Sequence, residues 1–134
     1  DSWIDHRRKI ASIYNENLKE ISEKGGVRLT LPNEDIYHSY YKYYFFIEPE
    51  KFTLTRDEII KKLNENNITA TVGSCGEIYL EDALKNLKPS NKLEDTKKLF
   101  DTGIMLLCDP TITETVANEN ICFLKNILVN CFKD

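Results

Sequence analysis

Residues 36–47 read IYHSYYKYYFFI, the run in this chain most strongly dominated by tyrosine, phenylalanine and isoleucine. Aromatic and β-branched side chains favour the pleated, half-buried surface of a strand. The run ends at Glu48-Pro49-Glu50, where the proline cannot donate a ladder hydrogen bond. The sequence therefore predicts a core strand over residues 36–47, with the rest of the fold packed around it.

The same run also invites comparison with an RNA-recognition strand, whose exposed rings stack on bases. Such a strand interleaves basic or glycine residues among its aromatics, whereas this one has only Lys42 and no glycine. The net charge is −4 and the pI is near 5.3. We therefore interpret the run as core packing and expect no nucleic-acid partner.

Amphipathic helices are predicted on both sides of this strand. Before it, apolar residues recur at helical spacing until Lys24-Gly25-Gly26 ends the pattern; near the C-terminus a second stripe follows Thr113, a predicted N-cap. The stripes are Ile10, Ile13, Tyr14, Leu18 and Ile21, and Ala117, Ile121, Leu124, Leu128 and Cys131.

Shorter elements fill the remainder. Strands are expected at residues 27–31, 68–72 and 104–108, and weaker helices at residues 79–87 and 92–100. Thr55 and Glu58 have the spacing of a capping box, which predicts a further helix after Thr55. The pattern indicates one α+β domain over residues 1–134, a small, mainly antiparallel sheet covered by helices.

Length and composition set limits on function. The chain has 134 residues and no apolar run long enough to cross a bilayer, and its first residues lack a signal-peptide pattern. We expect a cytoplasmic protein without a membrane partner. Because the chain begins at Asp1 without a methionine, it is consistent with a piece of a longer protein.

The cysteine spacing offers no metal site. Cys75, Cys108, Cys122 and Cys131 contain no CxxC pair, and Cys122 and Cys131 fall on opposite faces of a predicted helix. We expect reduced thiols and no bound metal.

Polar motifs are few. The loop Gly73-Ser74-Cys75-Gly76-Glu77 is either an anion-binding nest of backbone amides or an ordinary glycine-rich turn. His38 and Cys75 have the chemistry of a base and a nucleophile, but nothing in the sequence brings them together. Arg7-Arg8-Lys9 is either a solvated helix face or a phosphate contact. No catalytic residue is predicted.

The order of the motifs resembles the small domain of the DegT/DnrJ/EryC1/StrS sugar aminotransferases across nearly the whole chain. Residues 7–14, RRKIASIY, followed by Leu18, are similar to the helix that opens that domain, and Tyr37-His38 to the start of its aromatic strand. Arg56, Leu63 and Asn67-Ile68 follow the family's next helix and strand.

Residues 73–81, GSCGEIYLE, closely resemble a block of one branch of the family and are the most specific match. Residues 101–106 and Pro110-Thr111-Ile112-Thr113 resemble a later block of that branch. Gly76 stands where the branch usually has serine, and Asp109 where it usually has histidine, so no histidine role is transferred to Asp109.

The resemblance implies the C-terminal domain of a fold-type I enzyme that uses pyridoxal 5'-phosphate (PLP). Members are usually cytosolic homodimers that aminate a nucleotide-linked keto sugar, with glutamate as the normal amino donor. The Schiff-base lysine belongs to a large N-terminal domain, so this chain alone is expected to bind no PLP. Neither Lys42 nor Lys85 matches the motif of that lysine.

The resemblance also implies substrate contacts. They are Tyr37, His38, Ser74, Cys75, Glu77 and Tyr79. We expect His38 and Glu77 to line one concave surface, left exposed in this chain together with apolar patches that favour self-association. A stand-alone ligand-binding or regulatory module of the same architecture is the alternative. An upstream domain with a Schiff-base lysine in the parent reading frame distinguishes the two.

Overall fold

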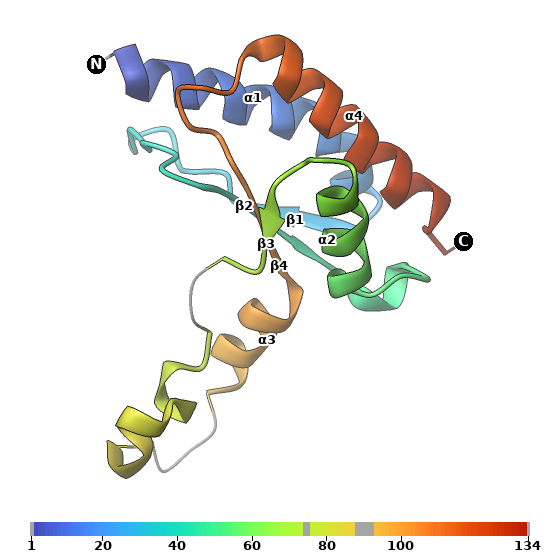
Figure 1. The fold of residues 1–134 in the computed structure, drawn as a ribbon. Coiled ribbons are helices and arrows are strands. Elements are labelled where there is room, and N and C mark those ends of the chain that lie inside the picture. Colours follow the sequence, from blue (N-terminus) through green and yellow to red (C-terminus); the bar gives the residue numbers. More distant parts are fainter. Residues whose placement is uncertain (1, 74–75, 88–92, 134) are drawn as a thin grey trace.

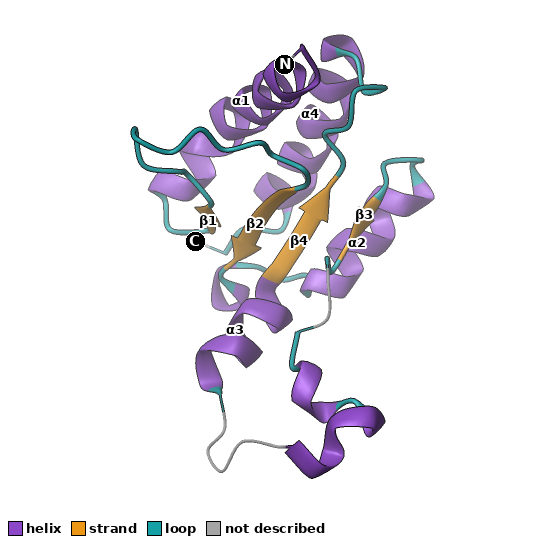
Figure 2. Ribbon diagram, turned by 90° about the vertical axis from the view of Figure 1, so that its left-hand side faces the viewer, coloured by secondary structure: helices purple, strands orange, loops and turns teal. Residues whose placement is uncertain are grey.

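The computed structural model describes residues 2–73, 76–87 and 93–133. A four-stranded antiparallel sheet in the order β1-β2-β4-β3 packs against three helices, α1, α2 and α4 (Figures 1 and 2). The elements are α1 (Ser2–Glu23), β1 (Val27–Leu29), β2 (Tyr43–Ile47), α2 (Arg56–Glu65), β3 (Ala70–Thr71), α3 (Glu94–Thr102), β4 (Gly103–Leu106) and α4 (Glu114–Asn130). The predicted α+β fold is confirmed.

Strand β2 lies at the centre of the core. Its alternate residues Tyr43, Phe45 and Ile47 are fully buried, while Tyr44 and Phe46 are half-buried on the other face. This alternation places one face of the sheet against the helices. The interpretation of the aromatic run as core packing is confirmed for residues 43–47.

The prediction of a strand over residues 36–42 is wrong. Tyr40 adopts a left-handed backbone conformation with φ of 44°, which interrupts an extended strand. Its N–H donates to Nδ1 of His38 at 3.0 Å, and its carbonyl accepts from the Cys108 thiol at 2.8 Å. Since β1 pairs only with residues 45–47, residues 36–42 have no ladder partner on that side.

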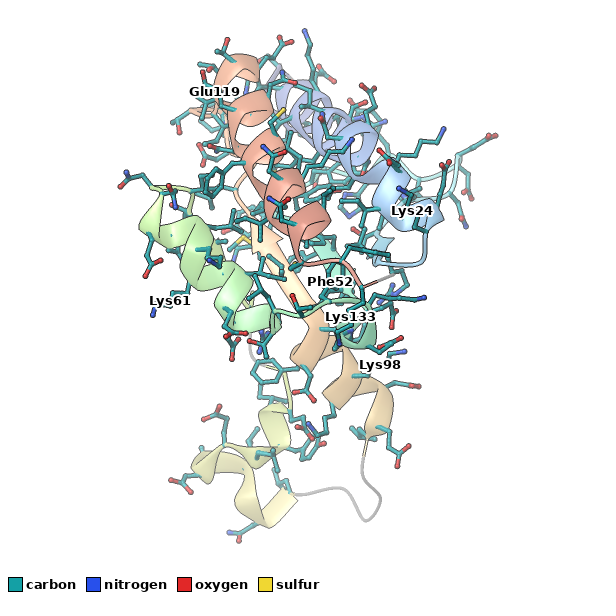
Figure 3. All side chains as sticks on the ribbon, turned by 90° about the vertical axis from the view of Figure 1, so that its right-hand side faces the viewer. Lys24, Phe52, Lys61, Lys98, Glu119 and Lys133 are labelled. Carbon is teal, nitrogen blue, oxygen red and sulfur yellow. The ribbon has the colours of Figure 1, made fainter. Side chains whose placement is uncertain are left out.

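The two predicted helical stripes are confirmed. All their members are buried except Ile13, which is half-buried, and α1 and α4 lie side by side over the sheet (Figure 1). Charged residues such as Lys61 of α2 and Glu119 of α4 point away from the body (Figure 3). The helices therefore follow the expected division into an apolar inner face and a charged outer face.

The capping box at the start of α2 is also confirmed. The Thr55 hydroxyl accepts from the Glu58 N–H at 3.3 Å, and the Glu58 carboxylate accepts from the Thr55 N–H at 2.8 Å. We predict that Thr55→Ala lowers the free energy of unfolding by about 1 kcal/mol, because it removes the acceptor for the helix N-terminus. Urea unfolding measures this, and Thr55→Ser, which keeps the hydroxyl, should match the parent chain.

Between β3 and β4 the chain leaves the sheet. Residues 76–87 form two 3-10 turns, Ile78–Leu80 and Asp82–Leu87, and α3 returns the chain to β4 (Figures 1 and 2). The weak helix expected at residues 79–87 is thus realised as 3-10 structure. Across the described ranges, no helix combines the length and apolar character that crossing a bilayer requires.

Candidate functional site

The register of the sheet defines two separate ends. Tyr43 pairs with Leu106 and Phe46 with Gly103, so the segments before β2 and after β4 meet at one end. Helix α3 runs directly into Gly103 and therefore lies at the other end. Figures 1 and 2 show the loop before β2 beside α1, and residues 76–87 with α3 at the opposite side of the sheet.

Tyr37 and His38 lie on the exposed loop beside α1. The Tyr37 hydroxyl donates to Asp5 at 2.6 Å, and this hydrogen bond raises the pKa of Tyr37. Arg8 stacks on the Tyr37 ring, 4.3 Å from its centroid, and donates to the His38 carbonyl at 3.0 Å. Helix α1 thus fixes the backbone of the loop and leaves both predicted residues accessible.

Further polar residues, outside the predicted set of substrate contacts, lie at this same end. The Arg7 guanidinium is 5.9 Å from the centre of the Tyr41 ring, and Nζ of Lys42 is 5.7 Å from it. The charge of Arg7 also contributes to lowering the pKa of Asp109, which follows β4. We call this set the arginine surface. It comprises Arg7, Arg8, Tyr37, His38, Tyr41, Lys42 and Asp109.

Asp109 is fixed as a carboxylate. Its Oδ1 accepts from the Thr111 hydroxyl at 2.5 Å and from the Thr111 N–H at 2.8 Å. These hydrogen bonds, followed by the charge of Arg7, hold the pKa of Asp109 below its ordinary value. A negative charge therefore occupies the position that the related branch gives to histidine.

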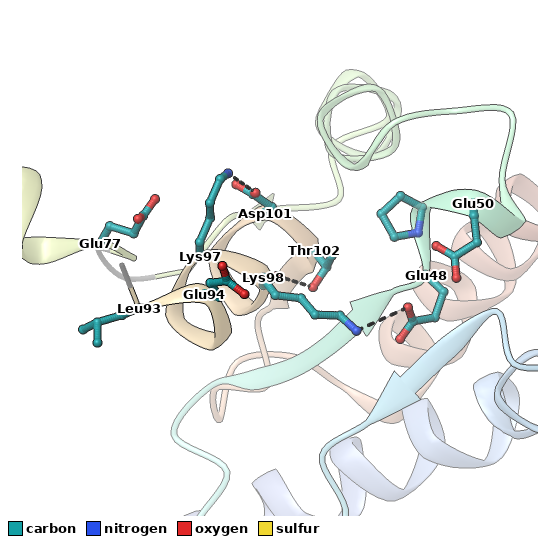
Figure 4. Close-up of a pocket in the computed structure, with 10 residues that line it drawn as sticks. Glu48, Glu50, Glu77, Leu93, Glu94, Lys97, Lys98, Asp101 and Thr102 are labelled. Carbon is teal, nitrogen blue, oxygen red and sulfur yellow. Dashed lines mark hydrogen bonds and ion pairs between the residues drawn. The ribbon is translucent and has the colours of Figure 1, made fainter. Parts of the chain in front are cut away.

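Glu77 and Tyr79 lie at the other end of the sheet. The Tyr79 hydroxyl donates to Glu77 at 2.5 Å, which raises the pKa of Tyr79. Glu77 lines a cavity of about 570 Å³ between α3 and Pro49–Lys51 (Figure 4). We call it the acidic cavity, because its charged lining residues are Glu48, Glu50, Glu77, Glu94, Asp101, Lys97 and Lys98.

Both lysines of the acidic cavity are paired. Lys97 contacts Asp101, and Lys98 lies 4.0 Å from Glu48 (Figure 4). The remaining carboxylates leave a net negative charge, which disfavours phosphate and suits hydroxyl or ammonium groups as ligands.

Ser74 and Cys75 lie outside the described residues. Gly76, next to them, packs against Phe100: a Cβ at Gly76 would lie 2.1 Å from Cγ of that ring. Serine at this position would force Phe100 to move, which gives a physical reason for glycine where the related branch has serine.

The expectation that His38 and Glu77 line one concave surface is wrong for this chain. His38 belongs to the arginine surface and Glu77 to the acidic cavity, at opposite ends of the sheet. The antiparallel register places the start of β2 and the start of β4 at opposite ends of the sheet, so residues that precede the two strands lie far apart. The turn at Tyr40 directs residues 36–39 back along α1.

The sequence held a signal for the residues that it missed. Lys42 directly precedes the strand core and Asp109 directly follows the last buried strand. In an antiparallel pair, the start of one strand and the end of its neighbour meet. Pairing β2 with β4 would have brought Tyr41, Lys42 and Asp109 together.

The described residues do not fit a complete PLP site. A Schiff-base lysine needs a protected environment in which its amine can lose its proton, and no lysine side chain that the structure describes is buried. Within residues 2–73, 76–87 and 93–133 no cluster of three metal-ligating side chains occurs.

Comparison with known proteins connects this geometry to a family. The chain superposes on the aminotransferase from Psychrobacter cryohalolentis with a TM-score of 0.89 and 27% sequence identity, covering 97% of this chain and 35% of that one. DesV from S. venezuelae, solved in complex with a ketimine intermediate, gives a TM-score of 0.81 at 19% identity, covering 96% of this chain and 32% of that one.

Helicobacter pylori PseC, an aminotransferase involved in the biosynthesis of pseudoaminic acid, gives a TM-score of 0.80 at 16% identity, covering 96% of this chain and 33% of that one. The chain thus spans about one third of the length of these structures. No curated protein sequence matches it. The family match itself extends over residues 1–122, and the chain therefore belongs to the DegT/DnrJ/EryC1/StrS aminotransferase family.

Proposed function

We propose that this chain is the C-terminal domain of a PLP-dependent aminotransferase that aminates a nucleotide-linked keto sugar for surface polysaccharide or related amino-sugar biosynthesis. The observation that carries the proposal is the family match over residues 1–122, supported by the 27% identical Psychrobacter aminotransferase. Because the chain covers 35% of that enzyme, we assign the Schiff-base lysine to a large N-terminal domain of the parent protein.

In the parent enzyme, which we propose to be a cytoplasmic homodimer using glutamate as donor, PLP supplies the electron sink. This domain supplies substrate contacts. Nδ1 of His38 accepts the Tyr40 N–H, so the neutral ring carries its proton on Nε2. The His38 side chain is exposed, and its Nε2–H can therefore donate to a sugar hydroxyl. At the far end of the sheet, the Glu77 carboxylate accepts a hydrogen bond from another group of the substrate.

Alone, the chain is expected to bind no PLP through a Schiff base and to transfer no amino group. A PLP titration followed by absorbance in the near-ultraviolet and visible checks this. A saturable Schiff-base band that disappears when one lysine is replaced would place the cofactor site in this chain and contradict the proposed division.

The substrate role is tested in the full-length parent enzyme. We predict that His38→Ala lowers kcat/KM for the keto sugar by roughly tenfold or more, because one hydrogen bond to substrate is lost. The matched control is the chain's other histidine: Nε2–H of His6 donates to the Ile112 carbonyl at 2.7 Å, so His6→Ala should change stability and leave kcat/KM nearly unchanged. Equal kcat/KM for the His38→Ala variant and the parent enzyme would remove His38 from the site.

A further inference from the structure

Arg7 has a buried nitrogen without a partner. Among the described residues, no atom accepts a hydrogen bond from its Nε, although this atom is shielded from solvent. A buried N–H donor without an acceptor is costly, and proteins keep few of them. The unpaired Arg7 donor therefore calls for a ligand or another role.

Arg56 shows what a structural arginine looks like in the same chain. Its Nε is also shielded and makes no hydrogen bond to a described residue, but it forms an ion pair with the Asp57 carboxylate at 2.5 Å. One of its terminal nitrogens donates to the carbonyls of Phe100 and Gly103 at 2.8 and 3.3 Å. Arg56 is thus held by acceptors of the fold, whereas Nε of Arg7 is not.

The four cations near Tyr41 and the start of α1 differ in their contacts. Lys9 forms a 2.6 Å ion pair with Glu114, and Arg8 is engaged with the Tyr37 ring and the His38 carbonyl. Arg7 and Lys42 instead both lie within 6 Å of the Tyr41 ring centre, at 5.9 and 5.7 Å. Both cations therefore lie around one aromatic ring.

Two carboxylates of this region accept hydrogen bonds from the fold, and Asp109 is also close enough to Arg7 for that charge, after the Thr111 hydrogen bonds, to help lower its pKa. Asp5 accepts from Tyr37, and Oδ1 of Asp109 accepts twice from Thr111. Tyr41 is 72% exposed, so the ring that both cations contact is open to solvent.

We propose that Arg7 and Lys42 form a binding site for the phosphate oxygens of a small-molecule diphosphate, with the Tyr41 ring holding the two cations in place. An arginine fork and a lysine point charge are the usual partners of phosphate. The acidic cavity at the other end of the sheet carries the opposite charge. The assignment to the nucleotide-linked substrate rests on the proposed function; the anion site itself rests on these contacts.

The lone tryptophan offers a direct probe. Trp3 lies one helical turn before Arg7 and is 67% exposed, so its fluorescence should respond to a ligand on Arg7. The 134-residue chain is titrated with pyrophosphate, with uridine diphosphate, with pyridoxal phosphate and with uridine. We expect saturable responses to the two diphosphates, weakened at roughly 0.5 M NaCl, and none to uridine.

Variants localise the binding. Arg7→Gln and Lys42→Gln should each weaken diphosphate binding about tenfold, since each removes a charge-assisted contact. Arg28→Gln is the matched control: Arg28 also stacks on an aromatic ring, 4.2 Å from the centre of Phe46, but on β1. It should bind as the parent chain does, and circular dichroism confirms that all three variants are folded.

Several results would overturn the site: no saturable binding by fluorescence and calorimetry, equal affinity in all variants, or tighter binding of a single-stranded oligonucleotide than of the diphosphates. Preference for pyridoxal phosphate would reassign the site to the cofactor phosphate. Amination by the parent enzyme separates the two proposals. If Arg7→Gln leaves the KM of the parent enzyme unchanged, the anion site is refuted and the proposed function stands. If the chain binds diphosphate but the parent enzyme shows no aminotransferase activity, the proposed function is refuted and the anion site stands.

Discussion

Replacing Tyr43 with alanine is expected to lower the free energy of unfolding by about 3–5 kcal/mol, a large part of the stability of an ordinary domain. The side chain is fully buried, and its ring packs edge-on against Tyr14 with 5.0 Å between centroids. Its hydroxyl donates to the Asn15 side chain at 2.7 Å. The substitution leaves a cavity between β2 and α1, and the Asn15 side chain loses its hydrogen-bond donor.

Two further variants separate these contributions in urea unfolding. Tyr43→Phe keeps the ring and should cost only about 1 kcal/mol, the contribution of one hydrogen bond. Tyr41→Ala removes the same side-chain type two residues earlier, where the ring is 72% exposed, and should stay within about 0.5 kcal/mol of the parent chain. Equal losses for Tyr41→Ala and Tyr43→Ala would contradict the burial of Tyr43 in the core and the exposure of Tyr41 at the surface.

Alkaline pH should destabilise the chain strongly. Burial raises the pKa of the Cys108 thiol from 9.0 to about 11, so the folded state retains a proton that the unfolded state loses. Its contribution is complete below about pH 9 and is lost as the pH rises through 11, which amounts to about 2–3 kcal/mol. Burial raises the pKa of Tyr14 and Tyr43 in the same direction, which extends the loss to higher pH.

Urea unfolding under reducing conditions, repeated from neutral pH to about pH 11, measures this loss. In Cys108→Ala the slope of stability against pH between about 9 and 11 should be smaller, because the thiol no longer titrates. Tyrosinate absorbance should show Tyr14 and Tyr43 ionising together with unfolding. A stability that stays constant across this pH range would contradict the burial of these three groups.

The elements that the sequence predicted well are those whose signal is local. The stripes of α1 and α4 repeat at helical spacing, and Thr55 and Glu58 specify the start of α2 through contacts three residues apart. Residues 36–42 failed because their conformation depends on partners far along the chain. The turn at Tyr40 is stabilised by two contacts: Arg8 donates to the His38 carbonyl, and the Cys108 thiol donates to the Tyr40 carbonyl. The aromatic composition of residues 36–42 predicts neither contact.

The candidate site follows the same division. Tyr37-His38 and Glu77-Tyr79 each form a local pair, as their spacing allowed, but placing one pair relative to the other required the register of β2 on β4. Arg7 shows most clearly which contacts the sequence alone cannot predict. Nothing in the RRK run distinguishes it from Arg8 or Lys9; only the ion pair of Lys9 with Glu114 and the stacking of Arg8 on Tyr37 separate the three.

The excursion between β3 and β4 has an evolutionary consequence. These strands are direct neighbours in the sheet, so the chain from β3 through α3 leaves and returns at adjacent positions. Loop-closure entropy grows slowly, by about 0.6 kcal/mol for each doubling of loop length. Insertions, deletions and substitutions in this segment can therefore reshape the acidic cavity while α1, α4 and the sheet keep their packing. The surface of this segment can therefore diverge without a change in the packing of the scaffold.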